Sequence, residues 1–311
     1  MLNQRPTKRL LDELKRHGVD TGWVLSDLDA TGYEKDHHEL ITYPREWAVE
    51  YAKHHWISNI ECTSDSFLGA FPGREWACQV AEKRGYWAVL QLDDNIIQTA
   101  FGKPSKVGIE LAKRYGFISF LDLLAQVTFS TNSCMTGASL SAVATAKPVI
   151  ARKGFPYSCF VEQVGPGRER WWGPFEDDIT HALQYGTRHD GVTAALMPLL
   201  RYGKESKSTT GMRSAYNHTR SVQLQRCFPE SVKLSIRHGR ANGYGDPRVF
   251  HHMDRNAIRN PLRVKNPEIY QGVGNRLTEI LSTYDGEAKN ALIEKVRSRI
   301  KKTKNRVGLS Y

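Results

Sequence analysis

The stretch that decides the fold is GYWAVLQLDDN, which runs from Gly85 to Asn95. It joins a continuous apolar run directly to two carboxylates and an amide. Such a run is typical of a buried strand in a parallel sheet, and the polar residues after it are expected at the sheet edge where α/β proteins bind ligands. Oxygen atoms gathered there suit a hard cation such as Mg²⁺ or Mn²⁺, which in turn binds phosphates. The alternative is local, because Asp and Asn are also favoured at turns and helix starts.

Helices and strands alternate before this stretch. We expect a helix over 7–18 that ends at Gly18, a strand over 22–27, a helix over 44–55, a strand over 56–62 and a helix over 74–84. This β-α-β-α-β alternation predicts an α/β fold with a mostly parallel mixed sheet flanked by helices.

The remainder of the chain is less regular. We interpret 131–146 as turn and helix, 155–173 as a mobile Gly- and Trp-rich loop, 178–185 as a helix, 202–219 as an exposed loop or lid, 232–238 as a strand, and 267–281 and 285–302 as helices. The expected organisation is one domain over 1–260, in two halves at about 20–125 and about 126–260. A basic helical segment over 261–311 is expected to pack on it.

Charge and cysteine content restrict the partners and the compartment. The chain has 44 Lys and Arg against 33 Asp and Glu, a net charge of +11, which favours polyanionic partners. Its five cysteines include no C-x-x-C pair, which argues against a disulfide framework and a zinc ribbon. No signal-peptide pattern and no long apolar run occur. We therefore expect a cytoplasmic monomer that does not enter a membrane.

Residues 73–95, GREWACQVAEKRGYWAVLQLDDN, resemble the donor-binding half of GT-A glycosyltransferases. In that fold a helix, a glycine turn and a strand that ends in Asp-x-Asp hold a nucleotide sugar. The resemblance implies a GT-A-like fold over 1–260, in which about 20–125 is the donor half and about 126–260 the acceptor half. The resemblance implies that Asp93 and Asp94 lie at the donor, with Asp93 facing the ribose or the metal and Asn95 at the usual metal-ligand position. It also implies that Arg74 contacts the diphosphate or uracil and that Asp27 lies near the base. Asn95, at the third motif position, weakens the local negative charge. For Arg74 the alternative is an ordinary surface residue of the helix.

A second acidic group, Glu176-Asp177-Asp178, follows the Gly- and Trp-rich segment. Acids in a first helical turn complement the helix dipole by ~0.3–1 kcal/mol each, without any chemistry. The aromatic flank is nevertheless similar to the acceptor-site motif of inverting GT-A enzymes. This resemblance implies Asp177 as the general base, with Asp178 as the next candidate, and Glu176 and Asp178 as residues that orient the acceptor or cap the helix. Such a base is typically worth ~10²–10⁴-fold in rate. The shared fold is also compatible with retention.

The stretch VKLSIRHGR, residues 232–240, ends in Arg-His. It resembles the late element of galactosyltransferase-type GT-A enzymes that supplies a histidine metal ligand. The resemblance implies that His238 joins Asp93, Asn95 and phosphate oxygens around Mn²⁺ or Mg²⁺. His251 and His252 are competing candidates, and a lone histidine is commonly a surface residue.

Residues 201–220 indicate a polyanionic acceptor. They carry five basic residues against one acid, Glu205, with Tyr202 and Tyr216 among them. Neutralised phosphates dominate DNA affinity, and aromatic rings stack on extruded bases. A solvated helix face and a flexible loop would explain the same composition.

Three stretches resemble one family more closely: LQLDDNI at 90–96, PFEDD at 174–178 and IRHGRANG at 236–243. They are similar to TET/JBP-associated glycosyltransferases, which are encoded largely by bacteriophages. The resemblance implies transfer of a hexose from a UDP-sugar to 5-hydroxymethylcytosine in DNA, in the host cytoplasm. The residues expected to contact DNA or the acceptor are Trp171, Trp172, Lys204, Lys207, Arg213, Tyr216, Arg237 and Arg240. Two alternatives remain open: a GT-A enzyme that acts on protein or polysaccharide, and a non-catalytic DNA-binding protein whose acidic clusters cap helices.

Overall fold

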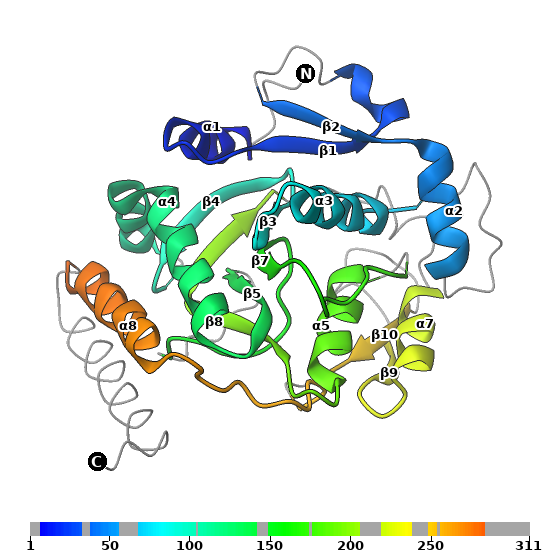
Figure 1. Cartoon of the computed structure of the whole chain (residues 1–311). Coiled ribbons are helices and arrows are strands. Elements are labelled where there is room, and N and C mark those ends of the chain that lie inside the picture. Colours follow the sequence, from blue (N-terminus) through cyan, green and yellow to red (C-terminus); the bar gives the residue numbers. More distant parts are fainter. Residues whose placement is uncertain are drawn as a thin grey trace.

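The computed structural model describes residues 7–32, 38–55, 68–103, 105–141, 149–173, 176–205, 219–237, 248–253 and 256–283. Its centre is a mixed sheet of six strands with helices packed on both faces (Figure 1). The predicted α/β class is therefore confirmed.

The six strands are β3 (Ala88–Leu92), β4 (Ile96–Phe101), β5 (Ser133–Leu140), β6 (Arg152–Lys153), β7 (Cys159–Gln163) and β8 (Thr193–Lys204). They follow the order β3-β7-β5-β8-β4, and β6 pairs with β8. Only β5 and β8 run parallel in this sheet, and the other described pairs are antiparallel. The expectation of a mostly parallel sheet was wrong. Parallel neighbours need a long crossover, usually a helix, and the link between the neighbours β5 and β7 shows no helix in its described part.

Two small sheets lie outside the main one. The strands β1 (Gly22–Ser26) and β2 (Glu39–Tyr43) pair in parallel. The strands β9 (Lys233–Arg237) and β10 (Arg248–His252) form an antiparallel ribbon beside α7 (Thr219–Cys227). Figure 1 shows β1 and β2 above the main sheet and β9 and β10 at the lower right, beside α7.

Two hydrophobic clusters cover the opposite faces of the main sheet. Residues of α1 (Lys8–Arg16), α4 (Lys106–Ser130) and α8 (Pro267–Ser282) form the first. Residues of α2 (Arg45–His55), α3 (Phe71–Lys83) and α5 (Asp177–Thr187) form the second, together with α7. In β7 the side chains alternate, since Cys159 and Val161 join the first cluster and Phe160 the second. The 3₁₀-helix η2 (Asp27–Gly32) links β1 to the segment before β2.

The longest helix, α4, bends where the sequence allows it. Gly116 has a φ of 77°, which glycine adopts without strain, and it separates two helical halves. Glu13 of α1 accepts a hydrogen bond from the backbone N–H of Phe117 at this bend. The Ser105 hydroxyl caps the start of α4 by accepting from the Gly108 N–H at 3.3 Å.

Several expected elements are confirmed and others were wrong. The helices over 7–18, 44–55, 74–84, 178–185 and 267–281 and the strands over 22–27 and 232–238 correspond to described elements with shifts of a few residues. Residues 133–140 form a buried strand and not a helix, and 202–204 belong to β8 and not to a lid. The expected strand over 56–62, the helix over 285–302 and most of the segment 206–219 lie outside the described residues.

Candidate functional site

Asp93 lies at the end of β3, where its carboxylate binds two cations. Its backbone N–H donates to the Ser158 carbonyl at 2.9 Å, which fixes the turn against the start of β7. Arg74 Nη2 lies 3.1 Å from Asp93 Oδ1, and Lys204 Nζ lies 2.5 Å from Asp93 Oδ2. The Asp93 side chain keeps 27% of its surface exposed, so this group borders solvent.

Arg74 joins the two acidic groups that the sequence singled out. It lies in the first turns of α3, and its Nε donates to Asp177 Oδ2 at 2.9 Å while Nη2 binds Asp93. The guanidinium lies 5.3 Å from the centre of the Phe160 ring and 5.1 Å from that of Trp171, which places aromatic surfaces beside it. Arg74 is only 10% exposed, so it is part of a buried bridge and not the surface helix residue of the alternative interpretation.

Asp177 and Asp178 begin α5 in the positions expected for acids that complement the helix dipole. Glu176 precedes them with a φ of 50°, the one left-handed residue other than glycine among those described. Its carboxylate lies 2.7 Å from Arg220 Nη1, at the start of α7. The backbone of Glu176 is strained, and strain of this kind is concentrated at functional sites. We call Arg74, Asp93, Asp177, Asp178 and Lys204 the Arg74 cluster.

The Arg74 cluster gives its carboxylates different protonation properties. Burial raises the pKa of Asp93, but the charges of Arg74 and Lys204 outweigh it and lower that pKa to about 2. Burial and, second, the charge of Asp177 raise the pKa of Asp178 well above its ordinary value. Burial also raises the pKa of Asp177, although Arg74 acts in the opposite direction. Carboxylates held at different pKa values within one site are typical of acid–base chemistry.

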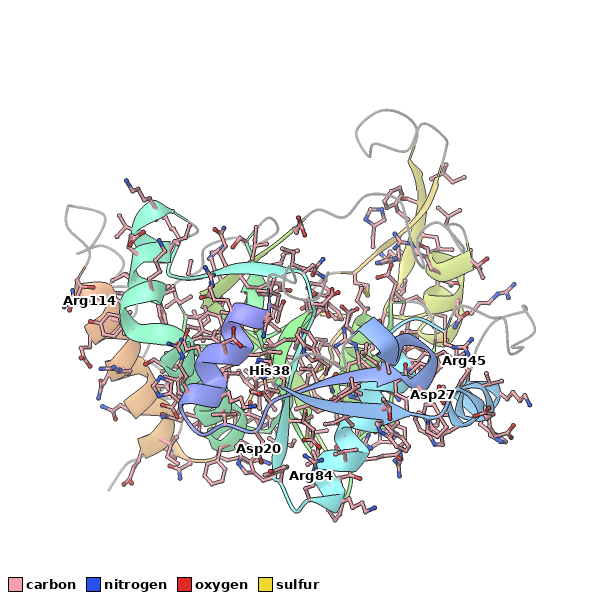
Figure 2. All side chains as sticks on the ribbon, turned by 90° about the horizontal axis from the view of Figure 1, so that it is seen from above. Asp20, Asp27, His38, Arg45, Arg84 and Arg114 are labelled. Atoms are coloured by element: carbon pink, nitrogen blue, oxygen red, sulfur yellow. The ribbon has the colours of Figure 1, made fainter. Side chains whose placement is uncertain are left out.

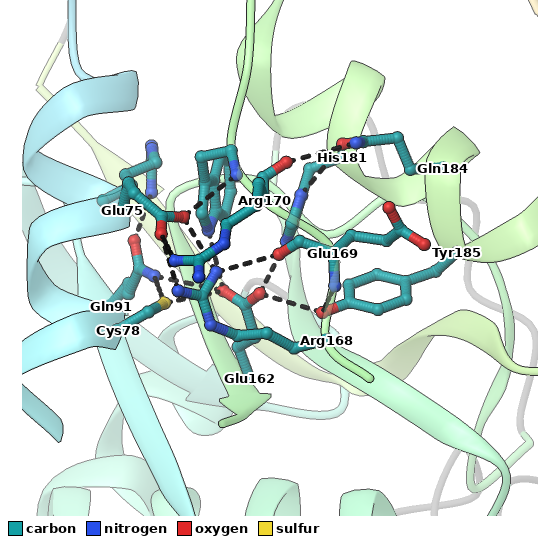
Figure 3. A network of polar contacts seen from close by, with 12 residues as sticks. Glu75, Cys78, Gln91, Glu162, Arg168, Glu169, Arg170, His181, Gln184 and Tyr185 are labelled. Atoms are coloured by element: carbon teal, nitrogen blue, oxygen red, sulfur yellow. Dashed lines mark hydrogen bonds and ion pairs between the residues drawn. The ribbon is translucent and has the colours of Figure 1, made fainter. Parts of the chain in front are cut away.

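A buried network adjoins the Arg74 cluster through Gln91 and Trp171. Figure 3 shows this network. Its centre is Glu162 of β7, whose side chain is fully buried. Glu162 Oε1 lies 2.5 Å from His181 Nε2 and accepts from the Tyr185 hydroxyl at 3.1 Å. Its Oε2 accepts from Gln91 Nε2 at 3.2 Å and from Trp171 Nε1 at 3.0 Å. A buried carboxylate is tolerated when it is paired and hydrogen-bonded in this way.

This network connects Glu162 to the Arg74 cluster along two routes. Gln91 accepts from Arg74 Nη1 through its Oε1 at 3.4 Å while it donates to Glu162. Trp171 donates to Glu162 and presents its ring to the Arg74 guanidinium. His181 also stacks on the Trp171 ring system, with ring centres 3.8 Å apart. Glu162 therefore holds in place the two side chains that flank Arg74.

The Gly- and Trp-rich segment is anchored to α3 through Glu75. This fully buried carboxylate binds Arg168 in a bidentate pair, at 2.7 and 2.8 Å, and Arg170 at 2.5 Å. It also accepts from the backbone N–H of Trp171 at 3.1 Å. The expectation of a mobile loop over 155–173 was wrong, because β7 and these ion pairs fix most of it in place.

Other predicted site residues lie apart from the Arg74 cluster or have different surroundings. Asp27 accepts from the backbone N–H groups of Leu28 and Arg45 and so joins the end of β1 to the start of α2 (Figure 2). Asp94 is half-buried in the turn after Asp93. Trp171 is fully buried, which contradicts its expected role as a surface that stacks on an acceptor. Trp172 is half-buried and stacks on Phe228, with ring centres 6.1 Å apart.

The remaining predicted contacts divide into two groups. Lys204, expected on an exposed loop, instead lies at the end of β8 and binds Asp93 and the Ser158 hydroxyl. The residues His238, Lys207, Arg213, Tyr216 and Arg240 and the side chain of Arg237 lie outside the described part of the structure.

The sequence reasoning missed Glu162, Gln91, His181 and Ser158. One signal could have identified Glu162, namely an acid in the middle of the apolar run Cys159–Gln163. Because a carboxylate is almost never fully buried without partners, such an acid predicts an internal network. The partners themselves come from β3, from α5 and from Trp171 beyond β7, and their sequence spacing carries no such signal.

The described donors do not fit a divalent cation at Asp93. In the described part of the chain no group of three or more His, Cys, Asp and Glu is arranged to hold a metal. Both Asp93 oxygens already bind side-chain cations. The Asn95 side-chain oxygen is buried without a partner among the described residues. The third expected ligand, His238, lies outside those residues. A Mg²⁺ ion is usually held by one or two carboxylates together with phosphates.

Comparisons with known proteins identify no relative. No family model matches the chain, and no curated protein and no solved structure matches it either. Within the described ranges, every helix is too short or too polar to span a bilayer.

Proposed function

We propose that this chain is a GT-A-type glycosyltransferase that moves a hexose from a UDP-sugar to the hydroxyl of 5-hydroxymethylcytosine in DNA. One observation carries the proposal: Arg74 binds both Asp93 and Asp177, so two acidic motifs far apart in the sequence meet at one guanidinium. The GT-A resemblance requires this meeting, because the donor and the acceptor must react at a single point. The resemblance to TET/JBP-associated enzymes and the net charge of +11 support DNA as the acceptor.

The proposed reaction is a single displacement. The acceptor hydroxyl loses its proton to Asp177 while its oxygen forms a bond to the anomeric carbon of the sugar. The bond from that carbon to the phosphate oxygen breaks, and its electron pair leaves with UDP. Arg74 engages Asp177 Oδ2 at 2.9 Å, and we assign the Oδ1 oxygen to the acceptor. Burial raises the pKa of Asp177, which brings this carboxylate nearer to the basicity that a general base needs.

The direct test is product analysis. Purified protein is incubated with UDP-glucose or UDP-GlcNAc and duplex DNA that contains 5-hydroxymethylcytosine, and the digested nucleosides are weighed by mass spectrometry. A nucleoside heavier by one hexose or N-acetylhexosamine residue is the expected result. No product on DNA, with transfer to protein or polysaccharide hydroxyls instead, would contradict the assigned acceptor.

The variant Asp177→Asn separates an enzyme from a binding protein. We expect it to lose ~10²–10⁴-fold in turnover and to keep its affinity for DNA. The matched control is Asp122→Asn, which removes an exposed carboxylate that only accepts from Gln126 on α4. Unchanged behaviour of Asp177→Asn in every assay would favour a non-catalytic DNA-binding protein.

A further inference from the structure

Lys204 occupies the place at Asp93 where the GT-A resemblance expects a metal. It is the last residue of β8, and the pairing of Ile96 with Lys204 sets it beside the turn that follows Asp93. The backbone N–H of Glu205 donates to the Asn95 carbonyl at 2.9 Å, which fixes the end of β8 against that turn. The position of Lys204 is therefore determined by the sheet and not by a flexible loop.

The ammonium group of Lys204 is oriented by two partners. Its Nζ lies 2.5 Å from Asp93 Oδ2 and 2.7 Å from the Ser158 hydroxyl oxygen. A lysine ammonium has three donors, so these contacts leave one N–H for another acceptor. The side chain is 26% exposed, and Asp93 beside it is exposed to a similar extent. Lys204 can therefore donate to a ligand without breaking either contact.

The two cationic side chains already bound to Asp93 argue against a divalent ion there as well. Arg74 and Lys204 take one carboxylate oxygen each, and a divalent ion bound to either oxygen would stand next to a positive side chain. Like charges at such separations repel strongly in a partly buried site. A nucleoside diphosphate bound there would instead contact Arg74 and Lys204, whose positive charges the fold already holds in position.

We propose that Lys204 binds the diphosphate of the nucleotide sugar and stabilises the charge that develops on the leaving UDP, in the role that a divalent metal has in other GT-A enzymes. This inference rests on the proposed function. When the bond between the anomeric carbon and the phosphate oxygen breaks, the electron pair remains on UDP, and the third Lys204 N–H donates to that diphosphate. Binding of the donor then requires no divalent cation.

The test measures UDP and UMP binding by isothermal titration calorimetry, in EDTA and in Mn²⁺. Wild-type protein is expected to bind UDP with a similar Kd in both buffers and more tightly than UMP. Lys204→Met should weaken UDP binding by ~10–100-fold, the loss expected for a hydrogen bond to a charged group, and leave UMP binding nearly unchanged. Lys204→Arg should retain much of the preference for UDP. The control Lys113→Met removes an exposed lysine of α4 that pairs with Glu110.

The possible outcomes distinguish this inference from the proposed function. Binding of UDP by wild-type protein only in Mn²⁺ would overturn the role of Lys204 and leave the transferase proposal in place. Absence of UDP binding in both buffers, by protein with a normal melting transition, would overturn both. If Lys204→Met does not fold, the Lys204→Arg variant and the wild-type comparison in EDTA still decide the question.

Discussion

Arg74 is the residue on which the arrangement of the candidate site depends. Its guanidinium lies between Asp93 and Asp177, and two aromatic rings flank it. Without this positive charge the two carboxylates would face each other in a partly buried setting. A planar guanidinium can bind two carboxylates at fixed angles, whereas a lysine ammonium is a single point charge on a flexible stem.

Replacement of Arg74 by Ala is expected to destabilise the fold by ~3–5 kcal/mol, because it removes the cation that binds Asp177 and leaves Asp93 with Lys204 alone. Arg74→Lys should cost less, since it keeps the charge but cannot reach both partners in the same geometry. Urea denaturation at neutral pH measures both effects. The control Arg16→Ala removes an exposed arginine of α1 and should stay within ~0.5 kcal/mol of wild type. A loss below ~1 kcal/mol for Arg74→Ala would show that the bridge does not stabilise the fold.

Replacement of Asp178 by Asn is expected to stabilise the protein in a pH-dependent way. Burial and the neighbouring Asp177 hold the pKa of Asp178 well above its ordinary value in the folded protein. The folded protein therefore binds the Asp178 proton more tightly than the unfolded chain does. As a result, the free energy of unfolding falls as pH rises above the unfolded pKa of this carboxyl. We expect Asp178→Asn to raise Tm by a few °C near pH 7.5 and to have little effect below about pH 4, where the unfolded carboxyl is protonated too.

Thermal melts between pH 4 and pH 8 check this expectation, with Asp122→Asn as the exposed control. An Asn at position 178 can still accept the Ile179 N–H that Asp178 Oδ1 accepts at 2.8 Å, so the substitution keeps the local contact. A lower Tm for Asp178→Asn at pH 7.5 would mean that the ionised carboxylate stabilises the helix start.

At the residue scale, the sequence identified the charged groups but not their partners. Asp93 and Asp177 could be predicted because each follows or begins a recognisable element. The bridge through Arg74 could not, since it depends on how α3 and α5 pack on the same face of the sheet. Trp171 was misjudged for a related reason: glycines around an aromatic residue indicate a mobile loop only when no buried ion pair holds that loop.

At the element scale, helices with local start and stop signals were predictable and the sheet was not. Asn266 and Pro267 mark the start of α8, and Gly18 follows α1 as expected. The strand β5 was not predicted, because its small residues, such as Gly137 and Ala138, lack the branched and aromatic pattern of most strands. Their small size lets neighbouring backbone approach closely, a requirement set by the fold and not by the local sequence.

Gly137 offers a test of that close packing. A Cβ atom at this position would lie 2.6 Å from the Pro156 Cβ and 3.0 Å from the Cys159 carbonyl oxygen. We expect Gly137→Ala to destabilise the fold by ~1–3 kcal/mol, because neither neighbour is the end of a flexible side chain. The matched control is Gly272→Ala in α8, where a Cβ meets nothing within 4 Å. That change should stabilise the protein by ~0.5–1 kcal/mol through helix propensity. Equal effects of the two substitutions in urea denaturation would contradict the packing argument.

At the scale of the whole molecule, the net positive charge lies outside the candidate site. The Arg74 cluster sets Arg74 and Lys204 against Asp93, Asp177 and Asp178, so it holds no positive excess. The net charge of +11 therefore comes from the rest of the chain. If DNA is the acceptor, its affinity should depend mainly on that surplus and not on the residues proposed for the chemistry.

This separation leads to a prediction about salt. A labelled duplex with 5-hydroxymethylcytosine, titrated by fluorescence anisotropy between 50 and 200 mM NaCl, should bind with a log–log slope of about −0.9 for each phosphate contact. About five contacts would weaken binding by several hundredfold over this range. The same slope is expected for Asp177→Asn and for the unmodified duplex, because both retain the charges that bind phosphate. A slope near zero would remove DNA as the acceptor and favour a protein or polysaccharide hydroxyl, since the Arg74 cluster itself places no requirement on the acceptor's charge.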